Sequence, residues 1–388
     1  MSLSVFNRKV ISTTTALVQE QINVFNGASN GALVLGSGQV IADYVEQVSL
    51  GLISGLVSER NPYAPAGTDA LLKVLAEQLT NNVNLYGKVG PFVITSGMME
   101  KINRDAATIS ATIAAQSAQG IIQQYLRSAV GALAAAIGGN SKAVHTQPER
   151  VNPNAGGANV LMLMDFPLAA GKFGDAAGMI NTWVMDGATW ANFTAYQVIP
   201  NVEQLFNIGN INVMGDGLGR RFLITDALSG TAGVQNSVLG LVPAAAVVTT
   251  TGLNMAAGQR LGGENIEDIM QGEFSYNLAL KGYRLKKTYT DTLNGKTPTR
   301  QADMLKASNW ETVTGGNVDN APYSIDQYDD RHDANGDPLT SPAAKVPTGT
   351  KRRQTAQEVI DQSVKETAGV LIKLTATVPA ASTGGTGA

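Results

Sequence analysis

The sequence contains no cysteine and only two histidines, so two common kinds of reactive side chain are scarce. Without cysteine the chain forms no disulfide, and no thiolate can serve as a nucleophile or a metal ligand. A metal site that used His145 or His332 would need carboxylates for most of its ligands. Both histidines lie in polar loop sequence, so we expect them to be solvated rather than catalytic.

Aromatic residues are also few, at 6% of the chain, whereas glycine occurs 42 times. This composition favours close backbone packing and many turns over large aromatic clusters. Apolar residues make up 44% of the 388 residues. That share is enough to bury a sizeable core, and the length allows two or three domains.

The chain has no strong charge and no long apolar run. Its net charge is −3, so no overall basic field attracts it to nucleic acid. The longest uncharged stretches, 106–126 and 227–259, are interrupted by Ser, Thr, Gln and Gly and do not predict a membrane span. No apolar segment follows Arg8 and Lys9, so a signal peptide is not expected. These features predict a soluble intracellular protein.

The first quarter of the sequence has weak periodicity and many turn signals. Residues 1–45 contain Asn26-Gly27 and Asn30-Gly31, and we expect an extended arm with one short helix. Residues 46–97 combine proline breaks, a helical pattern and a strand-like run. The helical pattern is Leu71, Leu72, Leu75 and Leu79, and the strand-like run is 83–86. Neither segment has a core of its own, so we expect both to pack on something else.

The strongest helical pattern lies within residues 98–137. Leu126, Val130 and Leu133 share one apolar face, and Gly138-Gly139 supplies the stop. A continuous helix of this length would extend about 60 Å. A break near Gly120 is the alternative, because glycine disfavours helix by about 1 kcal/mol against alanine.

The remaining sequence predicts a mixed α/β region and an irregular end. Helices are expected at 168–178 and 188–198, with strands at 180–185, 211–213, 222–225 and 244–249. Residues 273–290 alternate like one long strand. Residues 315–350 lack periodicity, 359–378 are expected to form a last helix or strand, and 380–388 are low in complexity.

Two glycine- or aspartate-rich segments are candidate ligand sites. Gly215–Arg221 precedes a strand where a dinucleotide-binding loop precedes a helix, its glycine spacing is GxGxG, and the lysine of a phosphate loop is absent, which favours a turn. Asp333–Asp337 has alternating oxygen side chains like a calcium loop. However, Pro338 and Ala344 stand where that loop needs Gly and Glu. A turn is favoured there too, with a loose cation site as the alternative.

Charged clusters are the other candidate sites. Glu264 and Glu267 are expected on one helical turn, as a solvated face or an inter-subunit salt bridge rather than an acid/base pair. The basic clusters are Arg284, Lys286 and Lys287, and then Lys351, Arg352 and Arg353. Neither cluster alternates with aromatic residues, so solvated surface or subunit contacts are favoured over nucleic-acid recognition. No GxSxG elbow accompanies the two histidines. We therefore assign no catalytic, cofactor-binding or metal-binding residue.

An ordered series of short motifs resembles a known family. Gly262–Ile269 contains a GEN turn, and Phe274–Arg284 is an alternating segment that ends in GYR. An NGKTPT loop follows at Asn294–Thr299, and an Asn-Trp pair comes after Ser308. Weaker matches occur earlier in the chain, at 25–32, 42–44, 90–91, 183–187 and 219–226. In this order, the motifs resemble the major capsid proteins of tailed bacteriophages. Asp186 stands where that family more usually has His, and 320–350 has no match.

This resemblance implies an α+β fold of the Hong Kong 97 type. Residues 1–45 would be the N-terminal arm and 46–97 the extended loop. Residues 98–174 would be the peripheral domain, which contains a long spine helix, and 175–260 would be the axial domain. Residues 261–314 would return to the peripheral domain with a long strand, and 315–388 would be an irregular loop and C-terminal segment.

The implied function is mechanical. Copies of the chain would form the hexamers and pentamers of an icosahedral shell around double-stranded DNA. The shell would be assembled in the cytoplasm of a host bacterium and become part of the virion. Partners would be scaffolding, portal and decoration proteins, with non-specific contacts to DNA and no cofactor. An encapsulin-like compartment is one alternative. A soluble α/β enzyme is another, although it would need a convergent polar site that the sequence does not show.

Overall fold

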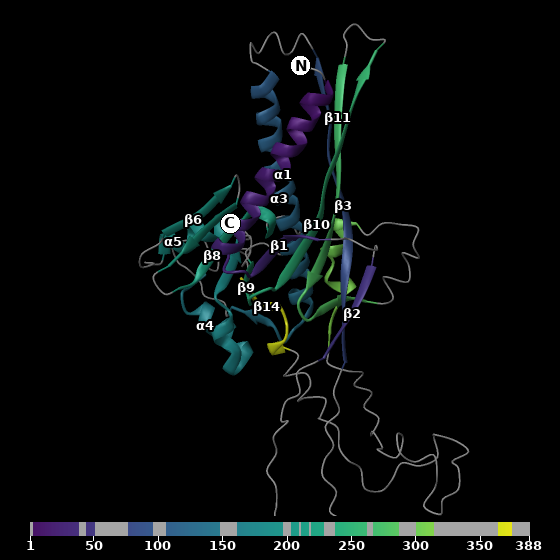
Figure 1. Cartoon of the computed structure of the whole chain (residues 1–388). Coiled ribbons are helices and arrows are strands. Elements are labelled where there is room, and N and C mark those ends of the chain that lie inside the picture. The colour runs from purple at the N-terminus through teal and green to yellow at the C-terminus, as the bar shows by residue number, and fades with distance from the viewer. Residues whose placement is uncertain are drawn as a thin grey trace, which may run out of the picture.

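The computed structural model describes the following residues: 3–38, 44–50, 77–95, 106–147, 161–196, 203–208, 211–216, 219–228, 237–261, 267–286, 300–313 and 364–374. Two sheets lie on either side of a long central helix, α3, which contacts both of them (Figure 1). One buried cluster joins residues of α1, α3 and both sheets. Helices and sheets contribute together, which confirms the predicted α+β class.

Helix α3, Ala106–Gly139, is the longest helix in the described part of the chain. Its 34 residues correspond to about 51 Å, and the helix is continuous through Gly120. The alternative of a break there is wrong: Gly120 is exposed and a side chain at that position would meet nothing. The predicted apolar face is confirmed, because Leu126, Val130 and Leu133 are all buried.

Replacing Leu133 by Ala should lower the free energy of unfolding by about 2–5 kcal/mol, because Leu133 is fully buried and its loss leaves a cavity. Gln116→Ala lies on the same helix at an exposed position and should change stability by less than about 0.5 kcal/mol. Urea unfolding followed by circular dichroism measures both variants. Equal midpoints would show that this face of α3 is not the core face.

The extended arm predicted for residues 1–45 is wrong over most of its length. Helix α1, Leu3–Ala28, has 26 residues and packs on α3. Val10, Ile22 and Phe25 are buried within the subunit. Thr14 interrupts the apolar pattern of this face while being fully buried itself, which hid the helix in the sequence. The turn signals near residue 30 mark the end of the helix.

The first sheet has five strands in the order β1-β10-β11-β3-β2. Their bounds are β1 Leu33–Ser37, β2 Tyr44–Leu50, β3 Glu77–Thr95, β10 Ala246–Arg260 and β11 Glu267–Leu280. Strands β10, β11 and β3 are antiparallel and form a long ribbon that projects beyond the rest of the sheet (Figure 1). Leu79 lies in β3, so its assignment to a helix is wrong, and residues 71–76 lie outside the described residues.

The second sheet has seven strands in the order β4-β14-β9-β5-β8-β7-β6. Their bounds are β4 Val144–Thr146, β5 Thr182–Met185, β6 Glu203–Ile208, β7 Ile211–Gly215, β8 Arg221–Thr225, β9 Ser237–Leu241 and β14 Gly369–Lys373. Three helices lie between its strands in the sequence: α4 (Asp165–Ala170), η1 (Gly171–Met179) and α5 (Gly187–Tyr196). A short helix at η2, Asp226–Leu228, follows β8. These elements confirm the predicted helices and strands between 168 and 225 and the last strand within 359–378, whereas the short strand predicted at 244–249 is the start of the long strand β10 in the first sheet.

Five aromatic rings converge in this second unit, contrary to the expectation from composition. Phe166 lies 4.7 Å from Trp183, 5.4 Å from Phe193 and 5.8 Å from Phe222 between ring centroids, and Trp190 lies 5.2 Å from Phe222. Edge-to-face rings pack densely and bury large areas. A low aromatic content therefore did not prevent the few aromatics from gathering in one place.

The long strand predicted for 273–290 is two strands. Strand β11 ends at Leu280, and β12, Tyr283–Leu285, pairs with β13, Trp310–Thr312, instead. Gly282 turns the chain between them with a φ of 72°, a left-handed conformation that favours glycine. Short helices α7, Gln301–Met304, and η3, Ala307–Asn309, precede β13.

Candidate functional site

The described residues of the glycine-rich segment 215–221 close a turn, as predicted, since the Gly219 N–H donates to the Asp216 carbonyl oxygen at 3.1 Å; Gly217 and Leu218 lie outside the described residues. Asp216 Oδ1 accepts a hydrogen bond from the backbone N–H of Arg220 at 2.8 Å, and Asp216 Oδ2 accepts one from Arg220 Nε at 2.7 Å. The guanidinium lies over the rings of Phe166 and Phe222, at 5.6 and 5.8 Å from their centroids. The turn therefore anchors the aromatic cluster, and its arginine is committed within the chain.

Two of the charged candidates that the structure describes, Arg284 and Glu267, lie near opposite charges of the same subunit, and Lys286 is half-buried with its backbone N–H donating to the Asn309 carbonyl oxygen at 2.9 Å. Arg284 Nε donates to Glu311 Oε1 at 2.7 Å across β12 and β13. Glu267 begins strand β11, so its assignment to a helical turn is wrong, and its carboxylate lies 4.0 Å from Arg260 Nη1. His145 is a half-buried residue of strand β4, which corrects its assignment to a solvated loop.

Several candidate residues cannot be placed. Lys287, Glu264, His332, the segment Asp333–Asp337 and the cluster Lys351–Arg353 lie outside the described residues. Among the residues that are described, no group of three or more histidines and acidic residues is close enough to hold a metal ion. No helix in the described ranges is long and apolar enough to cross a membrane.

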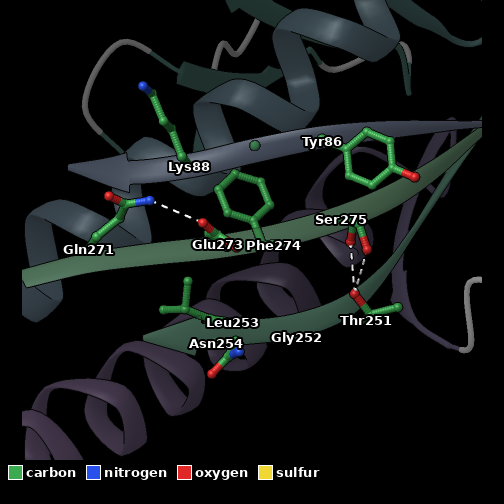
Figure 2. Close-up of a pocket in the computed structure, with 11 residues that line it drawn as sticks. Tyr86, Lys88, Thr251, Gly252, Leu253, Asn254, Gln271, Glu273, Phe274 and Ser275 are labelled. Atoms are coloured by element: carbon green, nitrogen blue, oxygen red, sulfur yellow. Dashed lines mark hydrogen bonds between the residues drawn. The ribbon is translucent and has the colours of Figure 1, made fainter. Parts of the chain in front are cut away.

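The ribbon carries a groove on its surface that no sequence motif indicated (Figure 2). The groove measures about 760 Å³ and is lined by residues of three strands: 86–88 of β3, 251–254 of β10, and 271 and 273–275 of β11. Lys88 and Glu273 are its charged residues, and Tyr86 is 54% exposed. These are the polar and aromatic groups of a contact surface, without a nucleophile paired to a base.

A bulge shapes this groove. The register between β10 and β11 shifts between Thr250 and Leu253, where Gly252 has a φ of 101°. Thr251 Oγ1 lies 2.9 Å from Ser275 Oγ and donates to the Ser275 carbonyl oxygen at 3.1 Å (Figure 2). Opposite Phe274, Gly87 leaves the space that the phenyl ring fills, because a Cβ there would collide with the ring. The ribbon therefore has a bulge in β10 after Thr250, and at the same height the Phe274 ring fills the space beside Gly87.

A buried hydroxyl network fixes this level of the ribbon to α3. Tyr125 Oη lies 2.7 Å from Thr250 Oγ1, and Ser128 Oγ lies 2.7 Å from Tyr276 Oη. Tyr125 also packs edge-on against Phe274, with centroids 5.7 Å apart. Burial raises the pKa of Tyr125 to about 12, and burial also raises the pKa of Tyr276. Each phenol is therefore held neutral at ordinary pH, and two hydrogen bonds and a ring contact join the helix to the ribbon.

These raised pKa values predict a loss of stability in alkali. Tyr125 has a pKa of about 12 in the folded protein and of about 10 in the unfolded chain. Its neutral phenol therefore stabilises the fold fully below about pH 10, and this contribution to the free energy of unfolding is lost as the pH rises towards 12. Tyr125→Phe should reduce this alkaline loss by up to about 1.4 kcal/mol per pH unit. Urea unfolding between about pH 9 and 11.5 measures it. Tyr86→Phe, at an exposed ring, should leave the slope unchanged. Identical slopes for all three proteins would contradict the network.

A second groove, of about 640 Å³, lies beside α4 and is largely apolar. Met162, Met164 and Trp183 line it together with Arg220. Met164 is 52% exposed, and nearby Leu168 and Met179 are 51% and 42% exposed. Apolar side chains gathered on a surface are typical of contacts between proteins.

Solved structures resemble this chain only at low identity. A chain of Microbacterium phage Oxtober96 is 13% identical, with a TM-score of 0.41, over 65% of this chain and 84% of that one. The capsid of Ralstonia phage GP4 is 9% identical, with a TM-score of 0.41, over 66% and 84%. A virus-like particle from Pyrococcus furiosus is 10% identical, with a TM-score of 0.36, over 70% and 94%. TM-scores below 0.5 do not establish a shared fold.

The family assignment rests instead on the sequence. No curated protein matches the chain. A family model described as Gp13-like, major capsid protein 13-like, matches residues 2–321 of the 388. This match confirms the resemblance that the motifs indicated, and it rules against an enzyme. The chain belongs to the Gp13-like family of major capsid proteins, and is thus a structural virion component that assembles with copies of itself.

Proposed function

We propose that this protein forms the hexamers and pentamers of an icosahedral shell that encloses the double-stranded DNA of a tailed bacteriophage. The observation that carries the proposal is the family match over residues 2–321. The subunit suits this role mechanically, because a 34-residue helix is hydrogen-bonded at two points to a long ribbon. A rigid plate with grooves on its surface can repeat the same contacts around rotation axes.

The subunit would follow the Hong Kong 97 type of capsid fold. In this assignment α3 is the spine helix of the peripheral domain, and the ribbon is that domain's long sheet. The seven-stranded sheet is the centre of the axial domain. Because this sheet includes β4 and β14 but not β10, the axial domain would draw on residues 144–146 and 369–373 as well as on 175–241, and 246–260 would belong to the peripheral domain.

The partners beyond copies of the chain follow from the same role. Scaffolding and portal proteins would guide assembly in the host cytoplasm, and decoration proteins would bind the finished shell. A net charge of −3 suits a container for DNA, because a strongly basic inner surface would hold the packaged DNA and hinder its release. Contacts with DNA would therefore be weak and independent of sequence.

Negative-stain microscopy of the expressed protein, alone and together with the scaffolding protein of the same phage, tests this function. Closed shells, capsomers or aberrant polymers are the expected result. A shell that enclosed protein cargo and never DNA would favour the encapsulin-like alternative. A protein that stays monomeric under both conditions would contradict the proposal.

A further inference from the structure

Strand β10 has one edge that is only half paired. On one side it pairs with β11 along nearly its whole length, from Ala246 opposite Leu280 to Arg260 opposite Glu267. On the other side, β1 pairs only with Ala246–Thr250. No strand in the described part of the chain pairs with that side over Thr251–Arg260. We call this stretch the bare edge.

Strand β1 does not continue along the bare edge. It ends at Ser37, and the Gly38 N–H donates to the Thr250 carbonyl oxygen at 3.0 Å as the last contact of this pairing. Strand β2 begins at Tyr44 on the opposite margin of the same sheet, beyond β3. Among the described strands, the one that follows β1 in the chain therefore lies on the far margin of the sheet and not beside β10.

The bare edge lacks the proline and lysine residues that often prevent strand pairing, while helix α1 packs against its inward-facing side chains. Prolines and lysines blunt exposed edges in natural sheets. The unpaired part of β3 contains Lys88 and Pro91, whereas Thr251–Arg260 contains no proline and only a terminal charge. That charge, Arg260, already faces Glu267.

The side chains of this stretch also divide in a way that suits pairing. Leu253, Met255 and Ala257 pack inward with Val10 and Met270. The outward side chains are small or short and are exposed: Thr251, Gly252, Asn254, Ala256 and Gly258. A second backbone can approach such residues closely, and the N–H and C=O groups of an edge supply its hydrogen bonds.

We propose that the bare edge of β10, Thr251–Arg260, binds an extended segment of a second copy of this chain by strand addition. The inference rests on the proposed shell and names one of its contact surfaces. A second copy fits best, because the family assembles with itself and the ribbon extends beyond the other strands of its sheet (Figure 1). Main-chain pairing needs no charge on the partner, and the single charge of this edge, Arg260, is too little to attract a nucleic acid.

Two proline substitutions test the pairing. Neighbouring residues of an edge strand direct their N–H groups to opposite sides, so one of Ala256 and Ala257 donates towards β11 and the other donates outward. Proline is tolerated only where the N–H points away from the sheet. One of the two variants, Ala256→Pro or Ala257→Pro, should keep the melting temperature of the free subunit, because its N–H points away from β11. That variant should form closed shells at no more than about a tenth of the wild-type yield. Ala256→Ser keeps the amide and should assemble normally.

Hydrogen exchange of wild-type subunits and shells gives a second, independent result, and it decides the question if neither proline variant folds. Alternate amides within 251–260 should exchange about tenfold or more slowly in shells, while the amides bonded to β11 are protected in both states. Normal assembly of a folded proline variant, or unchanged exchange of these amides in intact shells, would overturn the strand addition. Wild-type protein that forms no particle at all would instead contradict the proposed function.

Discussion

Replacing Phe25 by Ala should lower the free energy of unfolding of the free subunit by about 3–5 kcal/mol. Phe25 is fully buried near the end of α1, in the same cluster as Ile22 and Leu33. The adjacent residue, Val24, is 51% exposed on the opposite side of the helix. Val24→Ala is therefore the matched control, and it should change stability by less than about 0.5 kcal/mol.

This comparison decides whether the first helix belongs to the subunit or reaches a neighbour. Thermal unfolding of both variants, followed by circular dichroism at a concentration that prevents assembly, is the measurement. If α1 is part of the core, only Phe25→Ala melts early. Equal melting of both variants and the wild type, together with lost assembly of Phe25→Ala, would restore the extended arm that the sequence predicted.

Gly369→Ala should destabilise the subunit by more than about 3 kcal/mol. Gly369 begins β14 in the middle of the second sheet and has a φ of 153°. A Cβ at this position would collide with the carbonyl oxygen of Gly240 in β9, which is backbone and cannot rotate away. The substitution must therefore separate β14 from β9 or change the conformation of both.

The same substitution at Gly120 should have the opposite sign. Gly120 lies in α3, where an added Cβ meets nothing, so alanine should stabilise the subunit by about 1 kcal/mol. Urea unfolding measures both variants. A stable Gly369→Ala protein would show that β14 does not pair with β9 as described.

The elements with a strong apolar period could be predicted from the sequence, and those whose buried face contains a polar residue could not. Leu126, Val130 and Leu133 indicate α3 because each is apolar and each is buried. Helix α1 has a comparable face, but it contains the buried Thr14, and turn signals follow it closely. Local sequence also does not show that β11 ends at Leu280, because that end depends on the pairing of β12 with β13.

The candidate site was predictable only at the level of the family. The ordered motifs indicated a capsid protein, and the family match confirms that assignment. The ribbon groove was not predicted, because Tyr86 of β3 is far in the sequence from Thr251 and Phe274, which belong to the consecutive strands β10 and β11. The groove depends on a register shift after Thr250 that only the paired strands reveal. Contacts of this kind follow from sheet order, not from local residue patterns.

An electron cryomicroscopy reconstruction of the particle that this protein forms is the most direct test of its role as a shell subunit. The expected result is an icosahedral shell in which every hexamer and pentamer is built from this chain, with α3 and the ribbon resolved in each subunit. A particle whose shell is made of a different protein, with this chain absent or present only as a minor component, would contradict the account.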